Sequence, residues 1–137
     1  MKITPSSYEI DAYKKINIIF IILIMFIFLY CFSSSYISFN IKSSCEGMPL
    51  RYCKSRGLTR AFSEILKLNF QKALEYNPYS VKIFLFFLVQ LASRFFINIK
   101  IELYNFKRIL FLDVILSIAI FLFSFYNLIV IPFSSIK

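Results

Sequence analysis

Three long apolar runs, separated by polar and basic segments, dominate the pattern of hydrophobic and polar residues along the chain. The first run, residues 16–39, contains no charged residue and exceeds the roughly 20 residues that a helix needs to cross the hydrocarbon core of a bilayer. The second and third runs, residues 78–98 and 108–133, are long enough as well, although polar residues interrupt them. The pattern therefore predicts an all-α membrane protein with three transmembrane helices in a single domain, residues 1–137.

The segment between the first two runs, residues 40–77, is polar and basic but has a periodicity of its own. Apolar residues recur in it at helical spacing, which predicts two short helices at about residues 59–67 and 70–76. Their apolar sides are narrow and their other faces carry charges, a pattern typical of helices at a membrane surface. We expect both to be interfacial helices that pack on the spans.

Five residues mark the ends of these short helices. Gly57 supplies backbone freedom before the first helix, and Thr59 can cap its start. Asn69 has the position of a cap before the second helix. Asn77 followed by Pro78 repeats the start signal, a cap and then a proline at the first helical position of the second span.

Composition and charge agree with a membrane location. Of the 137 residues, 59% are hydrophobic, which is too apolar for a soluble domain of this size. The net charge is +9, but the basic residues flank the apolar runs and do not cluster with stacking aromatic residues. The expected partner is therefore the lipid bilayer, and we expect no nucleic acid. The chain has no histidine, which excludes Ser-His-Asp and Cys-His catalysis, so we assign no catalytic residue and expect no metal and no cofactor.

Lysine and arginine residues in the short flanks indicate an orientation. Lys14 and Lys15 precede the first span, while Lys107 and Arg108 lie in the link between the second and third spans. These two regions lie on the same side of a three-span protein, and we expect that side to be cytoplasmic. The N-terminus would then be cytoplasmic, and the C-terminus and residues 40–77 would face outward.

Four polar residues within the second and third runs are predicted to face one another. Residues at equal depth in an antiparallel hairpin have numbers that add to a constant, and Arg94 with Asp113 gives the same value as Gln90 with Ser117. We predict an intramembrane ladder with Arg94–Asp113 as its ion pair, because a charge within a span needs a partner. In the alternative, Arg94 reaches the headgroups unaided and Asp113 meets the basic residues of the link. A path for protons or ions is a third interpretation.

The run C-K-S-R-G-L-T-R-A-F, residues 53–62, is followed by F-x-x-A-L-x-Y-N-P and another apolar run. This arrangement resembles the DUF2752 family of small bacterial membrane proteins, which typically shows a C-P-x-C-G-[LM]-T-R-A core after its first span. The resemblance implies a bacterial inner-membrane protein of undefined biochemical role. The matching residues are Cys53, Gly57, Leu58, Thr59, Arg60, Ala61 and Phe62, then Phe70, Ala73, Leu74, Tyr76, Asn77 and Pro78.

Two positions depart from the family pattern. Lys54 stands where proline is usual, and Arg56 replaces the second motif cysteine, so one thiolate of the C-x-x-C pair is lost. Cys45 resembles the upstream cysteine of the family. With no histidine and only Cys45 and Cys53 in the loop, a four-ligand zinc site is not expected, whereas an outward, oxidising setting permits a disulfide between them. The stretch therefore favours a structural corner over a working thiol site.

Three functional interpretations follow. The first is a non-catalytic scaffold or accessory subunit that contacts other membrane proteins or further copies of the chain. The second is a thiol-dependent or anion-binding enzyme or redox component at the membrane surface, which uses Cys45, Cys53 and Arg60, since a guanidinium suits phosphate recognition. The third is a small transporter or channel subunit built on the polar hairpin. The motif corner that would bind a ligand consists of Cys53, Gly57, Thr59, Arg60, Asn77 and Pro78.

Overall fold

The computed structural model describes residues 7–37, 47–49, 52–101 and 105–129, and these residues form five helices without a strand. Three of the helices are long and apolar enough to cross a membrane, and the two short ones lie between the first and second of these in the chain. The structure thereby confirms the predicted fold class. The helices are α1 (Ser7–Ser33), α2 (Leu58–Leu66), α3 (Phe70–Tyr76), α4 (Ser80–Lys100) and α5 (Phe106–Ile129).

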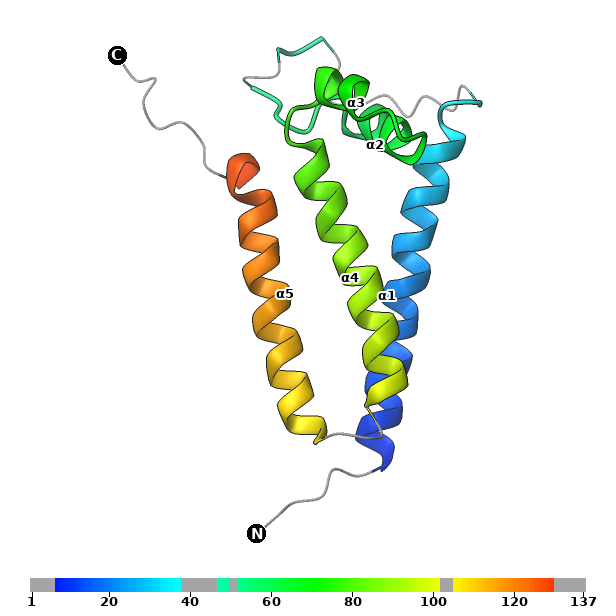
Figure 1. Ribbon diagram of the computed structural model, residues 1–137, viewed down its shortest axis with the longest axis vertical. Coiled ribbons are helices and arrows are strands. Elements are labelled where there is room, and N and C mark those ends of the chain that lie inside the picture. The colour runs from blue at the N-terminus through cyan, green and yellow to red at the C-terminus, as the bar shows by residue number, and fades with distance from the viewer. Residues whose placement is uncertain (1–6, 38–46, 50–51, 102–104, 130–137) are drawn as a thin grey trace, which may run out of the picture.

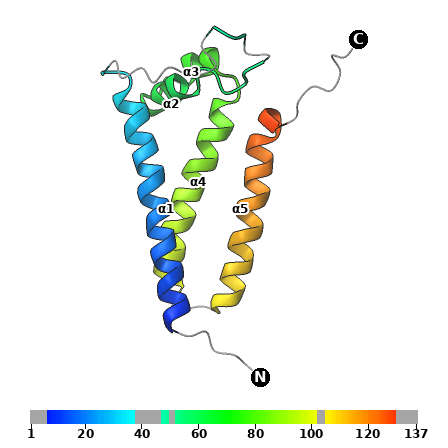
Figure 2. The same cartoon turned by 180° about the vertical axis from the view of Figure 1, so that it is seen from behind.

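The three long helices run side by side with α4 in the middle, and α2 and α3 lie across the ends of α1 and α4 (Figure 1). The view from behind shows the same order (Figure 2). The start of α1, the end of α4 and the start of α5 lie at one end of the bundle, and the short helices lie at the other (Figure 1). Helix α4 packs on α1 and on α5, whereas α5 packs chiefly on α4.

The main core lies where α1, α2 and α4 meet. Helix α2 inserts Phe62 between the two spans, and its ring meets the Phe84 ring edge-to-face with the centroids 5.4 Å apart. Phe84 in turn stacks on Phe28 of α1 at 5.0 Å. The apolar side of the amphipathic helix α2 thus packs against α1 and α4. The buried cluster consists of Ile24, Phe28, Cys31, Ala61, Phe62, Ile65, Ala73 and Ile83.

The bounds of all three long helices differ from those of the apolar runs. Helix α1 begins at Ser7, well before the first run, and ends at Ser33, where successive serines favour a turn. The Ser34 hydroxyl donates to the Cys31 carbonyl at 2.8 Å, a bond that replaces a further helical turn. Helix α4 begins at Ser80, two residues later than expected, and α5 begins at Phe106, two residues earlier than expected. Residues 38–39 and 130–133 of the predicted spans lie outside the described residues.

The expected caps are partly wrong. Gly57, and not Thr59, has the N-cap position of α2, because its φ of 76° is a left-handed conformation that glycine adopts without strain. Thr59 is an exposed residue within the first turn of α2. Asn69 does precede α3 as its N-cap, although its side chain makes no capping hydrogen bond. Pro78 lies in the turn before α4, outside the helix.

Candidate functional site

The polar residues of the α4–α5 hairpin lie against one another within the bundle. Arg94 Nη1 lies 2.5 Å from Asp113 Oδ2, and the side chains are only 13% and 4% exposed. Nearer the middle of the helices, Gln90 Nε2 donates to the Ser117 hydroxyl at 3.2 Å. The structure therefore brings together both predicted pairs of the ladder, and the Arg94 side chain lies within the bundle.

Helix α1 supplies a third side to this polar cluster, which the sequence analysis missed. The Tyr13 hydroxyl donates to Asp113 Oδ2 at 2.5 Å, and Arg94 Nη1 donates to Asn17 Oδ1 at 3.0 Å. The Asn17 amide, which is fully buried, also donates to Asn98 Oδ1 at 3.1 Å. The signal available in the sequence was Asn17 itself, an amide directly before a run of fifteen apolar residues, 18–32.

These contacts form one network, defined here as the Arg94 network: Tyr13, Asn17, Arg94, Asn98 and Asp113. The charges of Arg94 and Asp113 neutralise each other. Arg94 also donates a hydrogen bond to a neutral group of α1, and Asp113 accepts one from another. The Arg94 guanidinium also lies over the Phe20 ring, 5.4 Å from its centroid. In hydrocarbon, polar groups that satisfy one another hold helices together. The network therefore joins the three spans at one depth.

At the opposite end of the bundle, Asn77 holds the motif corner closed. Its amide nitrogen donates to the carbonyl of Lys54 at 2.8 Å and to that of Arg56 at 2.9 Å. Its amide oxygen accepts from the Tyr79 backbone N–H at 2.9 Å, which orients the start of α4. Asn77 is completely buried, so its hydrogen-bonding capacity serves the fold and is directed at no solvent-exposed ligand.

Gly57 allows the two parts of the corner to touch. A Cβ atom at this position would lie 2.7 Å from the Tyr76 carbonyl oxygen, which is closer than Cβ atoms in proteins come to other heavy atoms. The glycine is thus required by the backbone that precedes Asn77 as well as by its own positive φ. This contact joins the G-L-T-R-A block to the Y-N-P block in the folded chain.

The two residues that depart from the family pattern also hold backbone groups. Lys54 Nζ donates to the Asn127 carbonyl at 2.7 Å, and this carbonyl belongs to the last turn of α5, where no intrahelical partner is available. Arg56 Nη1 donates to the Met48 carbonyl at 2.6 Å. Lys54 thereby ties the corner to α5, and Arg56 stabilises the loop before it.

The remaining residues of the corner are not gathered into one cluster of reactive groups in the part of the chain that the structure describes. Cys53 is buried and disulfide-bonded, with the Ser55 hydroxyl 3.5 Å from its sulfur. Cys45, its expected partner, lies outside the described residues, so their pairing stays a prediction. Thr59 and Arg60 are exposed on α2, and neither side chain bonds to another described residue. Cys31 is a free thiol buried among the spans.

Comparison with known proteins gives one partial match. No curated protein and no solved structure matches the chain. Residues 51–91, less than half of the chain, match the model of a family described as "Protein of unknown function (DUF2752)", and the matched part comprises the motif corner, α2, α3 and the first half of α4. The match confirms the resemblance that residues 53–78 indicated, and over this region the chain is similar to proteins of unknown function.

Proposed function

We propose that this integral membrane protein is a non-catalytic scaffold or accessory subunit of a membrane-protein complex. Both groups of polar residues support this role, because each is engaged in holding the chain together. The Arg94 network joins three spans, and Asn77 and Gly57 close the corner. What the bundle offers to other molecules is therefore chiefly its apolar surface.

The main support for this proposal is the exposed apolar face of helix α5. The helix packs on α4 along one side, where Phe86 contacts both Phe121 and Phe125, and its other sides are apolar and exposed. Asp113 holds the helix near its start and Asn127 near its end, so its rotation about its own axis is restricted. A firmly held, aromatic-rich face suits a helix–helix contact with another protein. The exposed residues include Phe111, Leu112, Ile115, Leu116, Ile118, Leu122, Phe123 and Tyr126.

We further propose a bacterial cytoplasmic membrane as the location, with the N-terminus in the cytoplasm and the C-terminus outside. The disulfide-bonded Cys53 lies in the corner at the end of the bundle opposite the start of α1. Disulfides persist in oxidising compartments, which favours an outward corner. The lysines that precede the first span favour the same orientation. Labelling of cysteines introduced at Tyr8 and Tyr52 in intact cells tests it, since only the second should react.

Site-specific photo-crosslinking in cells tests the partner role. A photoreactive phenylalanine analogue at Phe111 or Phe123 of α5 should form an adduct with one distinct membrane protein or with a second copy of the chain. The same analogue at Phe26 of α1, which is exposed to a similar degree, is the matched control. The crosslinked protein should also co-purify in constant ratio in mild detergent. Adducts with lipid alone at all three positions would contradict the proposal.

A further inference from the structure

The connection between α2 and α3 contains a strained leucine. Leu68 has a φ of 62°, and its N–H donates to the Ile65 carbonyl while the Asn69 N–H donates to the Glu64 carbonyl. This is the helix-ending turn in which glycine is usual, because a side chain in the left-handed region meets its own backbone. Leu68 is nevertheless 79% exposed, so it gains almost no burial within the chain.

Helix α3 also exposes apolar side chains. Phe70 and Leu74 are four residues apart, which places them on one side of the helix, and they are 49% and 47% exposed. Ala73, next to them around the helix, is fully buried against the bundle. Gln71 and Glu75 occupy the side opposite Ala73 and are exposed. The helix thus has an inner face, an outer polar face and an apolar flank between them.

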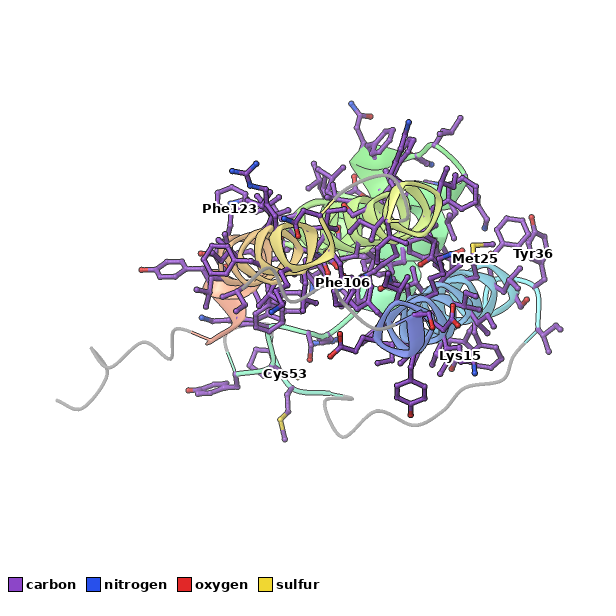
Figure 3. The ribbon with its side chains drawn as sticks, turned by 90° about the horizontal axis from the view of Figure 1, so that it is seen from below. Lys15, Met25, Tyr36, Cys53, Phe106 and Phe123 are labelled. Carbon is purple, nitrogen blue, oxygen red and sulfur yellow. The ribbon has the colours of Figure 1, made fainter. Side chains whose placement is uncertain are left out.

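The position of α2 and α3 brings this flank close to helix α4. Both helices lie across the ends of the spans, and α4 begins at Ser80, four residues after α3 ends (Figure 1). Seen from below, part of the green α2–α3 segment extends past α4 on the side away from Cys53 (Figure 3). Because α3 packs on α4, a candidate span with exposed apolar side chains, this flank lies beside the end of that span.

We propose that Leu68, Phe70 and Leu74 form an insertion edge that enters the adjoining leaflet of the bilayer beside α4. The chain would then contact one leaflet at a place outside its three spans, with Gln71 and Glu75 directed to water. Amphipathic helices bind membrane interfaces in this way, through apolar side chains placed at the headgroup boundary. The inference concerns lipid and does not depend on the partner role proposed above.

Tryptophan fluorescence tests the proposal without background, because the chain contains no tryptophan. The variants Phe70→Trp and Leu74→Trp are compared with Glu75→Trp, a control on the polar side of the same helix, each in bilayers with brominated acyl chains. Circular dichroism checks that each variant keeps its helices. We expect bromine quenching about twofold greater for the two edge variants, with weaker quenching by aqueous iodide.

Two results would overturn the inference. Equal bromine and iodide quenching at the edge and control positions would place the edge in water. Protection of Phe70→Trp and Leu74→Trp from both quenchers would show that protein, a second copy or a partner, covers the edge. Because either edge variant suffices, a failure of one to fold leaves the other to decide between these outcomes.

Discussion

The substitution Asp113→Asn tests whether the Arg94 network stabilises the bundle. Asparagine has nearly the same shape as aspartate and keeps a carbonyl oxygen that can accept hydrogen bonds. It removes the negative charge, however, and leaves the Arg94 guanidinium, whose side chain is 13% exposed, as an uncompensated cation between helices. The Asp113 oxygen that accepts from both Tyr13 and Arg94 is the atom at which the effect arises.

The expected cost follows from the contacts that are lost and kept. Removing one member of a buried ion pair costs about 3–5 kcal/mol in proteins generally, whereas single interhelical hydrogen bonds in bilayers contribute about 0.6–2 kcal/mol. Arg94 keeps its hydrogen bond to Asn17 and its contact with the Phe20 ring, which offsets part of the loss. We therefore expect Asp113→Asn to lower the free energy of unfolding by about 2–3 kcal/mol.

Reversible unfolding in mixed micelles with increasing dodecyl sulfate, followed by circular dichroism, measures this change. Ser117→Ala is the matched control, because it removes a neutral hydrogen bond to Gln90 one turn further along α5. The control should cost no more than about 1 kcal/mol. A difference between the two variants isolates the contribution of charge, since both lie on the same face of the same helix.

A charge-reversal cycle provides the outcome that would refute the reasoning. Asp113→Lys places two cations together and should lower the amount of folded protein, and the added substitution Arg94→Asp should restore part of it. The interaction energy from the cycle should favour the double variant by at least about 1 kcal/mol. If the double variant is as unstable as the sum of the single variants, or if Asp113→Asn costs no more than Ser117→Ala, the ion pair does not hold the spans together.

Three further substitutions address the corner and α2. Gly57→Ala should cost about 2 kcal/mol or more in the same unfolding assay, because its Cβ meets the Tyr76 carbonyl, and it should cost more than Gly47→Ala, which has a positive φ but open space around it. Asn77→Asp removes both donors to the carbonyls of Lys54 and Arg56 and should lower the free energy of unfolding by about 2–3 kcal/mol. Amide hydrogen exchange in the loop around Lys54 and Arg56 should become faster, and unchanged exchange there would contradict the prediction. Ser63→Ala should be neutral or stabilise by up to about 1 kcal/mol, because the buried hydroxyl has no hydrogen-bond partner among the described residues, and a loss of thermal stability would show otherwise.

Apolar periodicity was sufficient for the spans and for the α4–α5 ladder, because a short link between two helices fixes their relative depth. The contribution of α1 was not found, since α2, α3 and a long loop separate α1 from α4 and leave their register open. The structure supplies that register: the numbers of the contacting pairs Asn17–Arg94 and Phe28–Phe84 add to nearly the same value, as they must in antiparallel helices. Tyr13 was missed because it precedes the first apolar run.

The motif corner shows a different limit of reading a sequence. Thr59 has the chemistry of a cap, but the left-handed Gly57 takes the cap position, and local patterns do not distinguish the two choices. The reason for the glycine lies about twenty residues away, at the Tyr76 carbonyl. Likewise, Asn77 reads locally as a helix cap, and its amide does serve the Tyr79 N–H, but its two other bonds reach back to Lys54 and Arg56.

The polar residues of this chain are best understood from what a bilayer does not provide. Lipid solvates apolar side chains about as well as protein does, so apolar contacts alone fix the positions of the helices only weakly. Polar contacts between elements, called ties here, therefore decide the arrangement. Here the ties lie at the two ends of α5, at Asp113 and at Asn127. Substitutions of Asp113, or of Lys54, whose ammonium group donates to the Asn127 carbonyl, should therefore disturb assembly of the bundle first. Changes on the exposed face of α5, such as at Leu122, leave both ties intact, and a loss of partner binding without a loss of stability there would separate function from fold.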